Sequence, residues 1–286
     1  MKNLTNKYTV GAIASIPFFL LTAIFMIWPA LTIVFKTFVT EEGIRFDSIG
    51  RALTGTYQDS FWLSIQLSFV SAVIGGIAGL YLALLVGRLK PTSRIRILTQ
   101  AWSAVASQMG GVPLAFAFLS LLGTQGLLTK ILNDLGLDIL DAGFSLSSFS
   151  GWVLVYCYFQ IPLMFLIVSP AMSAMKPAWL EGATSLGAST GVYWRRIGLP
   201  ILSPVLLTGL LLLFVNSFSA YATVYALASG AGQLVPLQIR FILQGNVITG
   251  QADLGYALVT VSMALLLVAM VSITLLQRRF ARWADK

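Results

Sequence analysis

Few residues in this sequence could carry out covalent or metal chemistry. The chain contains no histidine, and its single cysteine, Cys157, lies in the apolar run VLVYCYF, where a small buried side chain needs no further role. This excludes disulfides, Cys/His zinc sites, haem ligation by histidine and nucleophiles activated by histidine. No GxxxxGK[ST] phosphate loop occurs either. We therefore expect a protein that is not an enzyme and that holds no metal or cofactor of its own.

The most informative spacing lies in the polar segment 176–200, KPAWLEGATSLGASTGVYWRRIGLP, between two long apolar runs. Residues 178–189 have helical periodicity, with Trp179, Ala183 and Leu186 on one face. The pattern predicts a short helix outside the apolar runs that flank it.

Gly187 lies near the end of this helix and permits either a hinge-like change of direction or a plain helix C-cap. Ser189 or Thr190 is suited to cap a second short helix. Pro200 suits the first turn of the next apolar helix, where its missing N–H has no intrahelical partner to lose. Together these residues predict a rigid helical elbow joined to the apolar helix that follows.

The elements around this segment are strongly apolar, because 57% of the 286 residues are hydrophobic, 10% are charged and the mean hydropathy is +0.87. A membrane-spanning helix needs about 20 mostly apolar residues. The uncharged stretches that qualify are 11–35, 61–87, 100–122, 151–173, 201–226 and 255–276. The expected fold class is all-α, a polytopic membrane protein with six transmembrane helices in a lipid bilayer. A further interfacial helix is expected around 237–243.

The distribution of charge predicts the orientation of these helices. The N-terminus, 88–99, 174–200 and the C-terminus together hold 13 of the 18 basic residues. Cytoplasmic loops carry the excess of Lys and Arg, so both termini (N-in/C-in) and the segment 176–200 are expected in the cytoplasm. Topology then explains the net charge of +8, and no nucleic-acid partner is expected.

The segment 176–200 resembles the EAA loop of type I binding-protein-dependent ABC importer permeases. The family pattern is E-A-A, three residues, G, nine residues, I, one residue, L-P, and every spacing fits. The one departure is glycine at the second position, which costs the helix up to about 1 kcal/mol. Arg195 and Arg196 fit membrane anchors as well as direct contacts to a partner. The positions that the resemblance assigns to ATPase coupling are Glu181, Gly182, Ala183, Gly187, Arg195, Ile197, Leu199 and Pro200.

The resemblance implies the type I ABC importer permease fold, with residues 61–276 as the transmembrane domain, 1–60 as an added helix and loop, and 277–286 as a basic tail. It implies two copies of a partner ATPase that binds ATP-Mg, a second permease and an extracytoplasmic binding protein. The second permease is expected to be a different chain, and the location is the bacterial cytoplasmic (inner) membrane. The alternatives are a passive channel, an ion-coupled carrier or a membrane scaffold with an ordinary cytoplasmic loop at 176–200.

Polar side chains within the apolar stretches either line the substrate pathway or hydrogen-bond one helix to another. The pathway candidates are Asn216, Ser217, Tyr221, Gln160 and Gln108. If 201–226 is one helix, Ser217 and Tyr221 share a face. In the second stretch, close helix packing is expected at Ser71, Gly75, Gly76 and Gly79.

The C-terminal part, with LVPLQI after a glycine-rich turn and a QRR end, resembles the spermidine/putrescine branch of the family most. A polyamine is therefore the expected substrate, and phosphonate, iron(III), thiamine or an oxyanion is the alternative. The resemblance implies that selectivity lies mainly in the binding protein.

Overall fold

The computed structural model describes residues 15–40, 43–44, 46–137, 139–141, 143–228, 233–244 and 252–284, with side chains described as far as residue 278. The basic residues Lys2, Lys7 and Lys286, the beginning of the first expected span and parts of the expected external loops lie outside the described residues.

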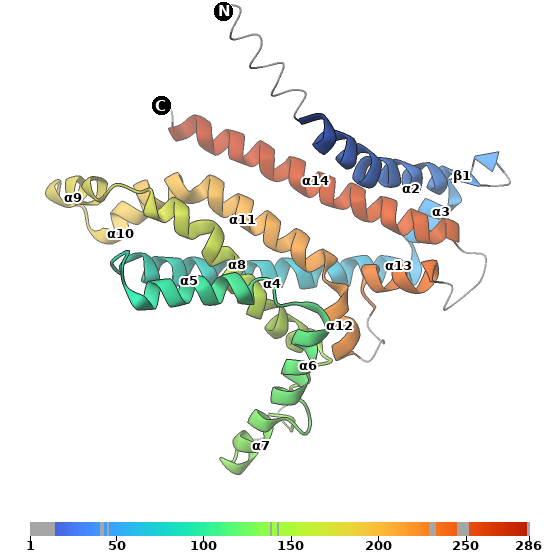
Figure 1. The fold of residues 1–286 in the computed structure, drawn as a ribbon, viewed down its shortest axis with the longest axis horizontal. Coiled ribbons are helices and arrows are strands. Elements are labelled where there is room, and N and C mark those ends of the chain that lie inside the picture. Colours follow the sequence, from blue (N-terminus) through green and yellow to red (C-terminus); the bar gives the residue numbers. More distant parts are fainter. Residues whose placement is uncertain are drawn as a thin grey trace, which may run out of the picture. The chain divides into compact units, whose positions relative to one another are not determined.

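The described chain is almost entirely helical, which confirms the all-α class (Figure 1). Its one pair of strands is a short antiparallel hairpin, in which Val39 lies opposite Ile44. The elements of the first half are η1 (Ala23–Ile27, a π-helical turn), α2 (Trp28–Phe38), β1 (Val39–Thr40), β2 (Gly43–Ile44), α3 (Asp47–Ala52), α4 (Gly55–Gly87), α5 (Arg94–Ala106), α6 (Gly111–Leu122) and α7 (Leu127–Asp134). Those of the second half are α8 (Phe149–Ser173), α9 (Pro177–Ser185), α10 (Thr190–Tyr193), η2 (Trp194–Gly198, also π-helical), α11 (Leu199–Ser219), α12 (Tyr221–Leu227), α13 (Val235–Leu243) and α14 (Ala252–Ala284).

Six helical stretches among the described residues are long and apolar enough to cross a membrane, as predicted. They are Ser15–Phe38, Gly55–Gly87, Gly111–Asp134, Phe149–Ser173, Thr190–Ser219 and Ala252–Arg278. The helix expected around 237–243 is also present, as α13.

The predicted bounds of the third span, 100–122, are wrong because the chain is not helical throughout. α5 ends at Ala106, and α6 begins at Gly111, whose backbone has a φ of +72°. Pro113 lies two residues further on, and a proline cannot donate the hydrogen bond that would continue a helix from α5. The break stays hidden in a hydropathy pattern because the longer stretches on both sides of it are mostly apolar. The stretch that could cross the membrane begins at the break and continues through α7.

The predicted fifth span, 201–226, is wrong at both ends. The helical stretch starts at Thr190 and ends at Ser219, where Ala220 leaves the helix with φ −83° and ψ 68°. Tyr221 begins the separate helix α12. The predicted common face of Ser217 and Tyr221 does not exist, because the two residues belong to different helices.

The chain divides into two compact units, one formed by residues 1–58 and 238–264. In this unit α3 is joined to the start of α14, because Asp253 accepts a hydrogen bond from the Ser48 hydroxyl at 2.9 Å and pairs with the Arg51 guanidinium. α2 is joined to the same helix through a contact of 2.7 Å between the hydroxyls of Thr37 and Thr260.

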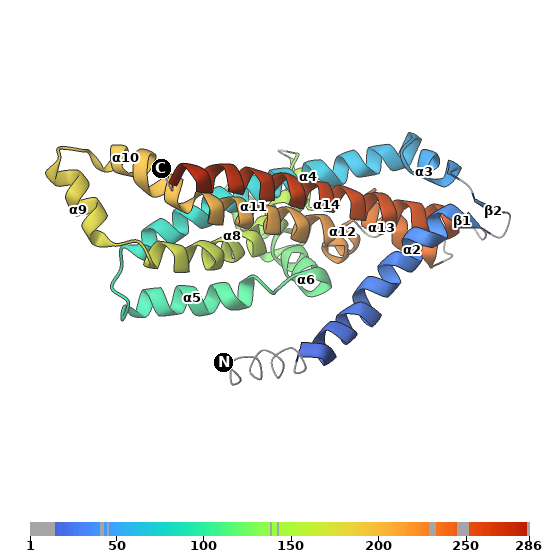
Figure 2. The same cartoon turned by 90° about the horizontal axis from the view of Figure 1, so that it is seen from above.

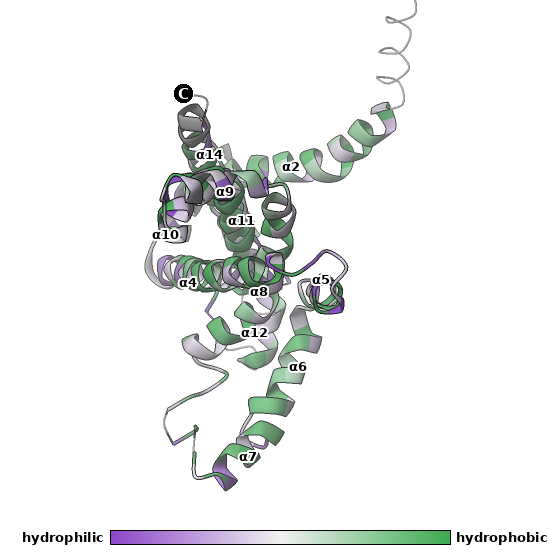
Figure 3. Cartoon of the chain, turned by 90° about the vertical axis from the view of Figure 1, so that its left-hand side faces the viewer, coloured by the Kyte–Doolittle hydropathy of each residue, from purple (hydrophilic) through white to green (hydrophobic). Residues whose placement is uncertain are grey.

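The second unit contains residues 59–237 and 265–286, and α8 is its central helix. α8 is the most buried of the candidate spans, and it packs against α4, α5 and α11 (Figure 2). α6 and α7 project away from α5 and α8, with apolar residues along α6 (Figure 3). The buried side chains of this core are Ala72, Ala83, Val86, Met164, Phe165, Val168 and Leu213.

Glycines on α4 allow the close approach of α8. A Cβ atom on Gly79 would lie 2.6 Å from the carbonyl oxygen of Ile161, and one on Gly75 would lie 2.7 Å from the Cβ of Gln160. Real Cβ atoms do not approach other atoms so closely, so larger residues would push the helices apart. The predicted packing role of these glycines is confirmed.

Candidate functional site

The elbow begins with α9, and its end is fixed by a glycine C-cap. The N–H of Ala188 donates to the carbonyl of Ala183 at 3.0 Å, and the N–H of Gly187 donates to that of Thr184 at 2.9 Å. This hydrogen-bond pair is a Schellman motif, which places its glycine in the left-handed region. Gly187 has a φ of +80°. The helix therefore ends before residue 189, earlier than predicted, and the C-cap is the role that the geometry shows for Gly187.

α10 follows at once and is anchored by an aromatic pair. The Ser189 hydroxyl accepts the N–H of Val192 at 3.4 Å, so the predicted N-cap is confirmed. Tyr193 is buried, and its ring meets that of Trp194 edge to face with centroids 5.6 Å apart. The two short helices thus form a defined elbow.

A π-helical turn joins the elbow to α11 without a break. The N–H of Leu199 bonds to the carbonyl of Trp194, five residues earlier. In a regular α-helix the ring of Pro200 would clash with the carbonyl of Arg196, and the wider turn relieves this clash. Gly198 is required here, because a Cβ on it would lie 2.4 Å from the Trp194 ring.

The elbow exposes apolar side chains. α9 and α10 project beyond the ends of α8 and α11 in both views (Figures 1 and 2). Leu186 is 89% exposed, Trp179 and Leu180 are also exposed, and of the predicted apolar face only Ala183 is buried. Glu181 is exposed beside them. The elbow therefore presents a mixed apolar and acidic surface that the described part of this chain does not cover.

Two of the predicted pathway residues meet in the core of the second unit. The Gln160 amide of α8 donates to the Ser71 hydroxyl of α4 at 2.9 Å and to the Ser217 hydroxyl of α11. The two hydroxyls lie 3.2 Å apart, and all three side chains are buried. These residues link three helices and expose no surface in this chain.

The other three predicted pathway residues are placed differently. Asn216 and Gln108 are exposed, and Tyr221 is half-buried at the start of α12. Sequence reasoning missed Tyr156, whose hydroxyl donates to the carbonyl of Ala220 at the helix break. Within an apolar run a tyrosine carries no signal that distinguishes it from a core aromatic residue.

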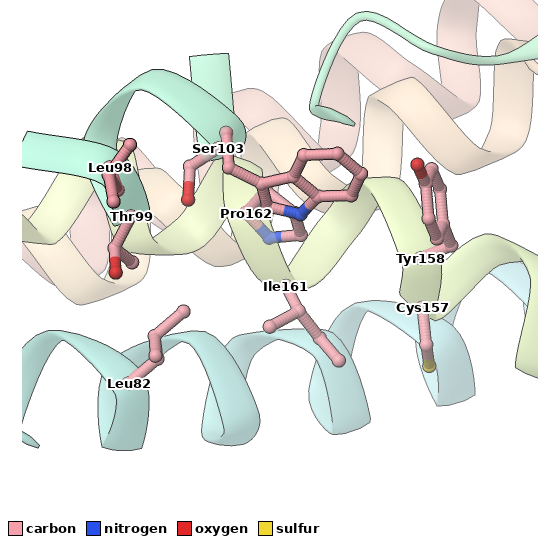
Figure 4. A pocket seen from close by; sticks show the side chains of 9 residues that line it. Leu82, Leu98, Thr99, Ser103, Cys157, Tyr158, Ile161 and Pro162 are labelled. Carbon is pink, nitrogen blue, oxygen red and sulfur yellow. The ribbon is translucent and has the colours of Figure 1, made fainter. Parts of the chain in front are cut away.

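An open pocket of about 540 Å³ lies between α4, α5 and α8 (Figure 4). Leu82, Leu98 and Ile161 give it apolar walls, and Tyr158 and Thr99 add hydroxyls. No charged residue and none of the five predicted pathway residues lines it. The pocket therefore offers no charge–charge recognition of a cationic or anionic solute.

The described residues thus form a polytopic helical bundle with a protruding elbow, and they contain no group of three or more His, Cys, Asp or Glu side chains that could hold a metal ion. The profile of the binding-protein-dependent transport system inner membrane component family matches residues 75–285. The chain belongs to this family, and it is a permease subunit of an ABC importer.

Characterised relatives differ in the solute that they transport. The chain is 25% identical over 263 residues to PotB, the spermidine/putrescine transport system permease protein of Haemophilus influenzae, covering 88% of this chain and 85% of PotB. It is 25% identical to the sulfate transport system permease protein CysT of Salmonella typhimurium, covering 78% of this chain and 77% of CysT. It is 28% identical to the molybdenum transport system permease protein ModB of Mycobacterium tuberculosis, covering 65% of this chain and 69% of ModB.

Solved structures confirm the fold. A chain of a bacterial ABC transporter that imports the acidic polysaccharide alginate superposes with a TM-score of 0.75 at 19% identity, over 97% of this chain and 98% of that one. A chain of the MetNI methionine ABC transporter in an inward-facing conformation superposes with a TM-score of 0.55 at 16% identity. The match covers 78% of this chain and 95% of that one. The chain therefore has the fold of ABC importer permeases.

Proposed function

We propose that this permease is driven by a separate ATPase that binds the elbow formed by α9 and α10. The observation that supports this most directly is the exposure of Leu186 and Trp179 on a short helix outside the apolar spans. Exposed apolar side chains grouped with a charged residue, here Glu181, are typical of a surface that binds another protein. The matched EAA spacing supports the same position.

The structure also suggests how movement would reach the bundle. Thr190–Ser219 is one continuous helical stretch, so α10 is the elbow end of the helix that contains Ser217. Two ATPase subunits that close on ATP-Mg would displace the elbow, and the displacement would act directly on α11. The Gly187 cap and the buried Tyr193 make the elbow rigid. The elbow would therefore transmit this displacement to α11 instead of bending.

Photocrosslinking tests this contact. A photoreactive residue at Leu186 should give an adduct with a protein that carries an ATP-binding phosphate loop. The control position is Leu135, which is 71% exposed and follows α7, in the segment expected outside the cytoplasm. An adduct from Leu186 with no ATP-binding protein, or the same ATPase adduct from both positions, would contradict the proposal.

We further propose that both termini and the elbow face the cytoplasm of a bacterium. The only native cysteine is buried, so a Cys157→Ala chain provides an unreactive background. A membrane-impermeant maleimide added to intact cells should label Leu135→Cys, and it should label Leu186→Cys only after the cells are opened. The reverse labelling pattern would show that the chain has the opposite orientation in the membrane.

For the substrate we propose a polyamine, delivered by an extracytoplasmic binding protein to this permease and a second, different permease. The match to PotB over 88% of the chain supports this choice, and the matches to CysT and ModB make sulfate and molybdate the competitors to test. Asn216 and Gln108 are the proposed pathway residues with exposed side chains. ATP-dependent uptake of labelled spermidine that sulfate and molybdate do not inhibit is the expected result. Inhibition by either anion would mean that this anion, and not a polyamine, is the substrate.

A further inference from the structure

Two of the apolar stretches in the second unit are broken, and the two breaks share one feature. Each separates a helix that packs on α8 from a shorter apolar helix, which is α6 after residues 107–110 and α12 after Ala220. A break in a helix leaves backbone groups that need other partners. The partners found at these breaks indicate which parts of the unit are joined.

The first contact joins the two shorter helices to each other. The N–H of Gly111, at the start of α6, donates to the hydroxyl of Thr223 in α12 at 2.9 Å. Thr223 is fully buried, and a Cβ on Gly111 would lie 3.7 Å from the Cβ of Ala222. α6 packs closely on α12, and the two lie side by side in Figures 1 and 3. They form one compact piece, called here the α6–α12 body.

The second set of contacts fixes the break at Ala220, and the last turn of α11 before it, to α8. Tyr156 and Gln160 are four residues apart, so they share one face of α8. The Tyr156 hydroxyl donates to the carbonyl of Ala220 at the break, and the Gln160 amide donates to Ser217 in the last turn of α11. Both side chains are fully buried.

The chemistry of these contacts favours a switch with two positions over a continuously flexible joint. The two amide protons of Gln160 reach the Ser71 and Ser217 hydroxyls, and the Ser71 hydroxyl donates to the carbonyl of Leu67 at 2.6 Å. Leaving a buried polar group unpaired is costly, and the Gln160 Oε1 already has no hydrogen-bond partner among the described residues. If the break at Ala220 and the last turn of α11 move away from α8, the Tyr156 hydroxyl and the Gln160 amide lose these partners together, so the contacts are expected to break as a set.

We propose that the α6–α12 body moves as one piece during transport, together with the break at Ala220 and the last turn of α11, with Tyr156 and Gln160 as positioning residues that hold this break in the conformation described. The inference rests on the proposed transport function. It assigns Gln160 and Ser217 to the control of the pathway and not to contact with the solute. It also explains why Gly75 is required, since a side chain there would displace Gln160.

The test measures two distances by pulsed electron resonance in the purified complex, on a Cys157→Ala background. Spin labels at Ala117→Cys in α6 and Leu154→Cys in α8 measure the distance between the α6–α12 body and α8. Labels at Ala117→Cys and Ala226→Cys in α12 report distances within the body. Adding ATP-Mg should change the first distribution and leave the second unchanged.

The positioning role predicts a population shift without nucleotide. Tyr156→Phe removes only the hydroxyl, and losing one such hydrogen bond shifts an equilibrium by about 5- to 10-fold. In the first distance distribution, the ratio of the form seen with ATP-Mg to the form seen without it should rise by that factor. Ser217→Ala should act in the same direction. Ser68→Ala is the matched control, because this buried hydroxyl bonds only to its own helix, at the Ser64 carbonyl.

The outcomes separate the two proposals. If the first distance distribution is the same in Tyr156→Phe and Ser217→Ala as in the control Ser68→Ala, the positioning role is wrong. If the distance within the body changes as much as the distance to α8, the single moving piece is wrong. If ATP-Mg changes nothing in the native sequence while Tyr156→Phe shifts the population, coupling to the ATPase is wrong and the switch stands.

Discussion

The left-handed backbone of Gly187 gives a quantitative prediction for the elbow. A residue with a Cβ pays about 1–2 kcal/mol to adopt this conformation. A Cβ on Gly187 would have no atom within 4 Å, so Gly187→Ala adds backbone strain and no steric clash. At about 1.4 kcal/mol per factor of ten, the equilibrium constant between the elbow conformation and its alternatives should fall by about 5- to 30-fold.

The assay is ATP-dependent uptake in vesicles that contain equal amounts of each variant complex. Gly187→Ala should lower the initial rate, by at most the same factor of about 5 to 30, with the chain still inserted. Gly187→Asn should recover part of the rate, because asparagine tolerates positive φ better than other residues with a Cβ. Gly182→Ala is the matched control: Gly182 lies within α9 with equally open space around it, so alanine there should stabilise the helix by about 0.5–1 kcal/mol.

Uptake by Gly187→Ala at the rate of Gly182→Ala would refute this reasoning. It would mean that the ATPase accepts an elbow without the Schellman cap. The same result combined with a crosslink at Leu186 would keep the binding surface and remove the requirement for a rigid elbow.

Two further predictions concern the packing of each unit. Gly79→Ala should lower the midpoint of thermal unfolding in detergent more than Gly76→Ala. The new Cβ at Gly79 would meet backbone of α8 at 2.6 Å, whereas at Gly76 it would meet only the end of a leucine side chain; equal midpoints would contradict the close α4–α8 contact. Asp253→Asn should destabilise the other unit by about 1 kcal/mol or less, because the Arg51 side chain of the pair is 44% exposed and solvent screens it. A double-mutant cycle with Arg51→Ala measures this coupling, and a coupling energy of zero would show that the pair contributes nothing.

The number of spans and the position of the elbow could be predicted because each depends on a local pattern. Six apolar stretches are long enough to cross a bilayer, and the spacing from Glu181 to Pro200 is a one-dimensional motif. The Ser189 cap and the glycine packing on α4 could be predicted for the same reason, since helix ends and small-residue stripes follow from nearby residues.

The helix breaks could not be read from hydropathy averaged over a span, because the longer stretches on both sides of each break are mostly apolar. Gly110, Gly111 and Pro113 are a signal that could have located the first break. The break at Ala220 has no glycine or proline beside it. It is stabilised by Tyr156, 64 residues earlier, and only the tertiary structure brings the two together.

The extension of the fifth span was missed for a related reason. Pro200 suggested a helix start, since proline usually interrupts the hydrogen-bond ladder. The π-helical turn before it allows the helix to continue, and a similar turn, η1, precedes Pro29 in the first span. A proline two residues after such a turn is therefore compatible with an unbroken span.

The most direct test of the central claim is to purify this chain from native membranes in detergent and identify every associated protein by mass. The account predicts an ATPase in two copies, a second and different permease, and an extracytoplasmic binding protein whose retained ligand names the substrate. A chain that purifies alone and conducts solute in liposomes without ATP would contradict it.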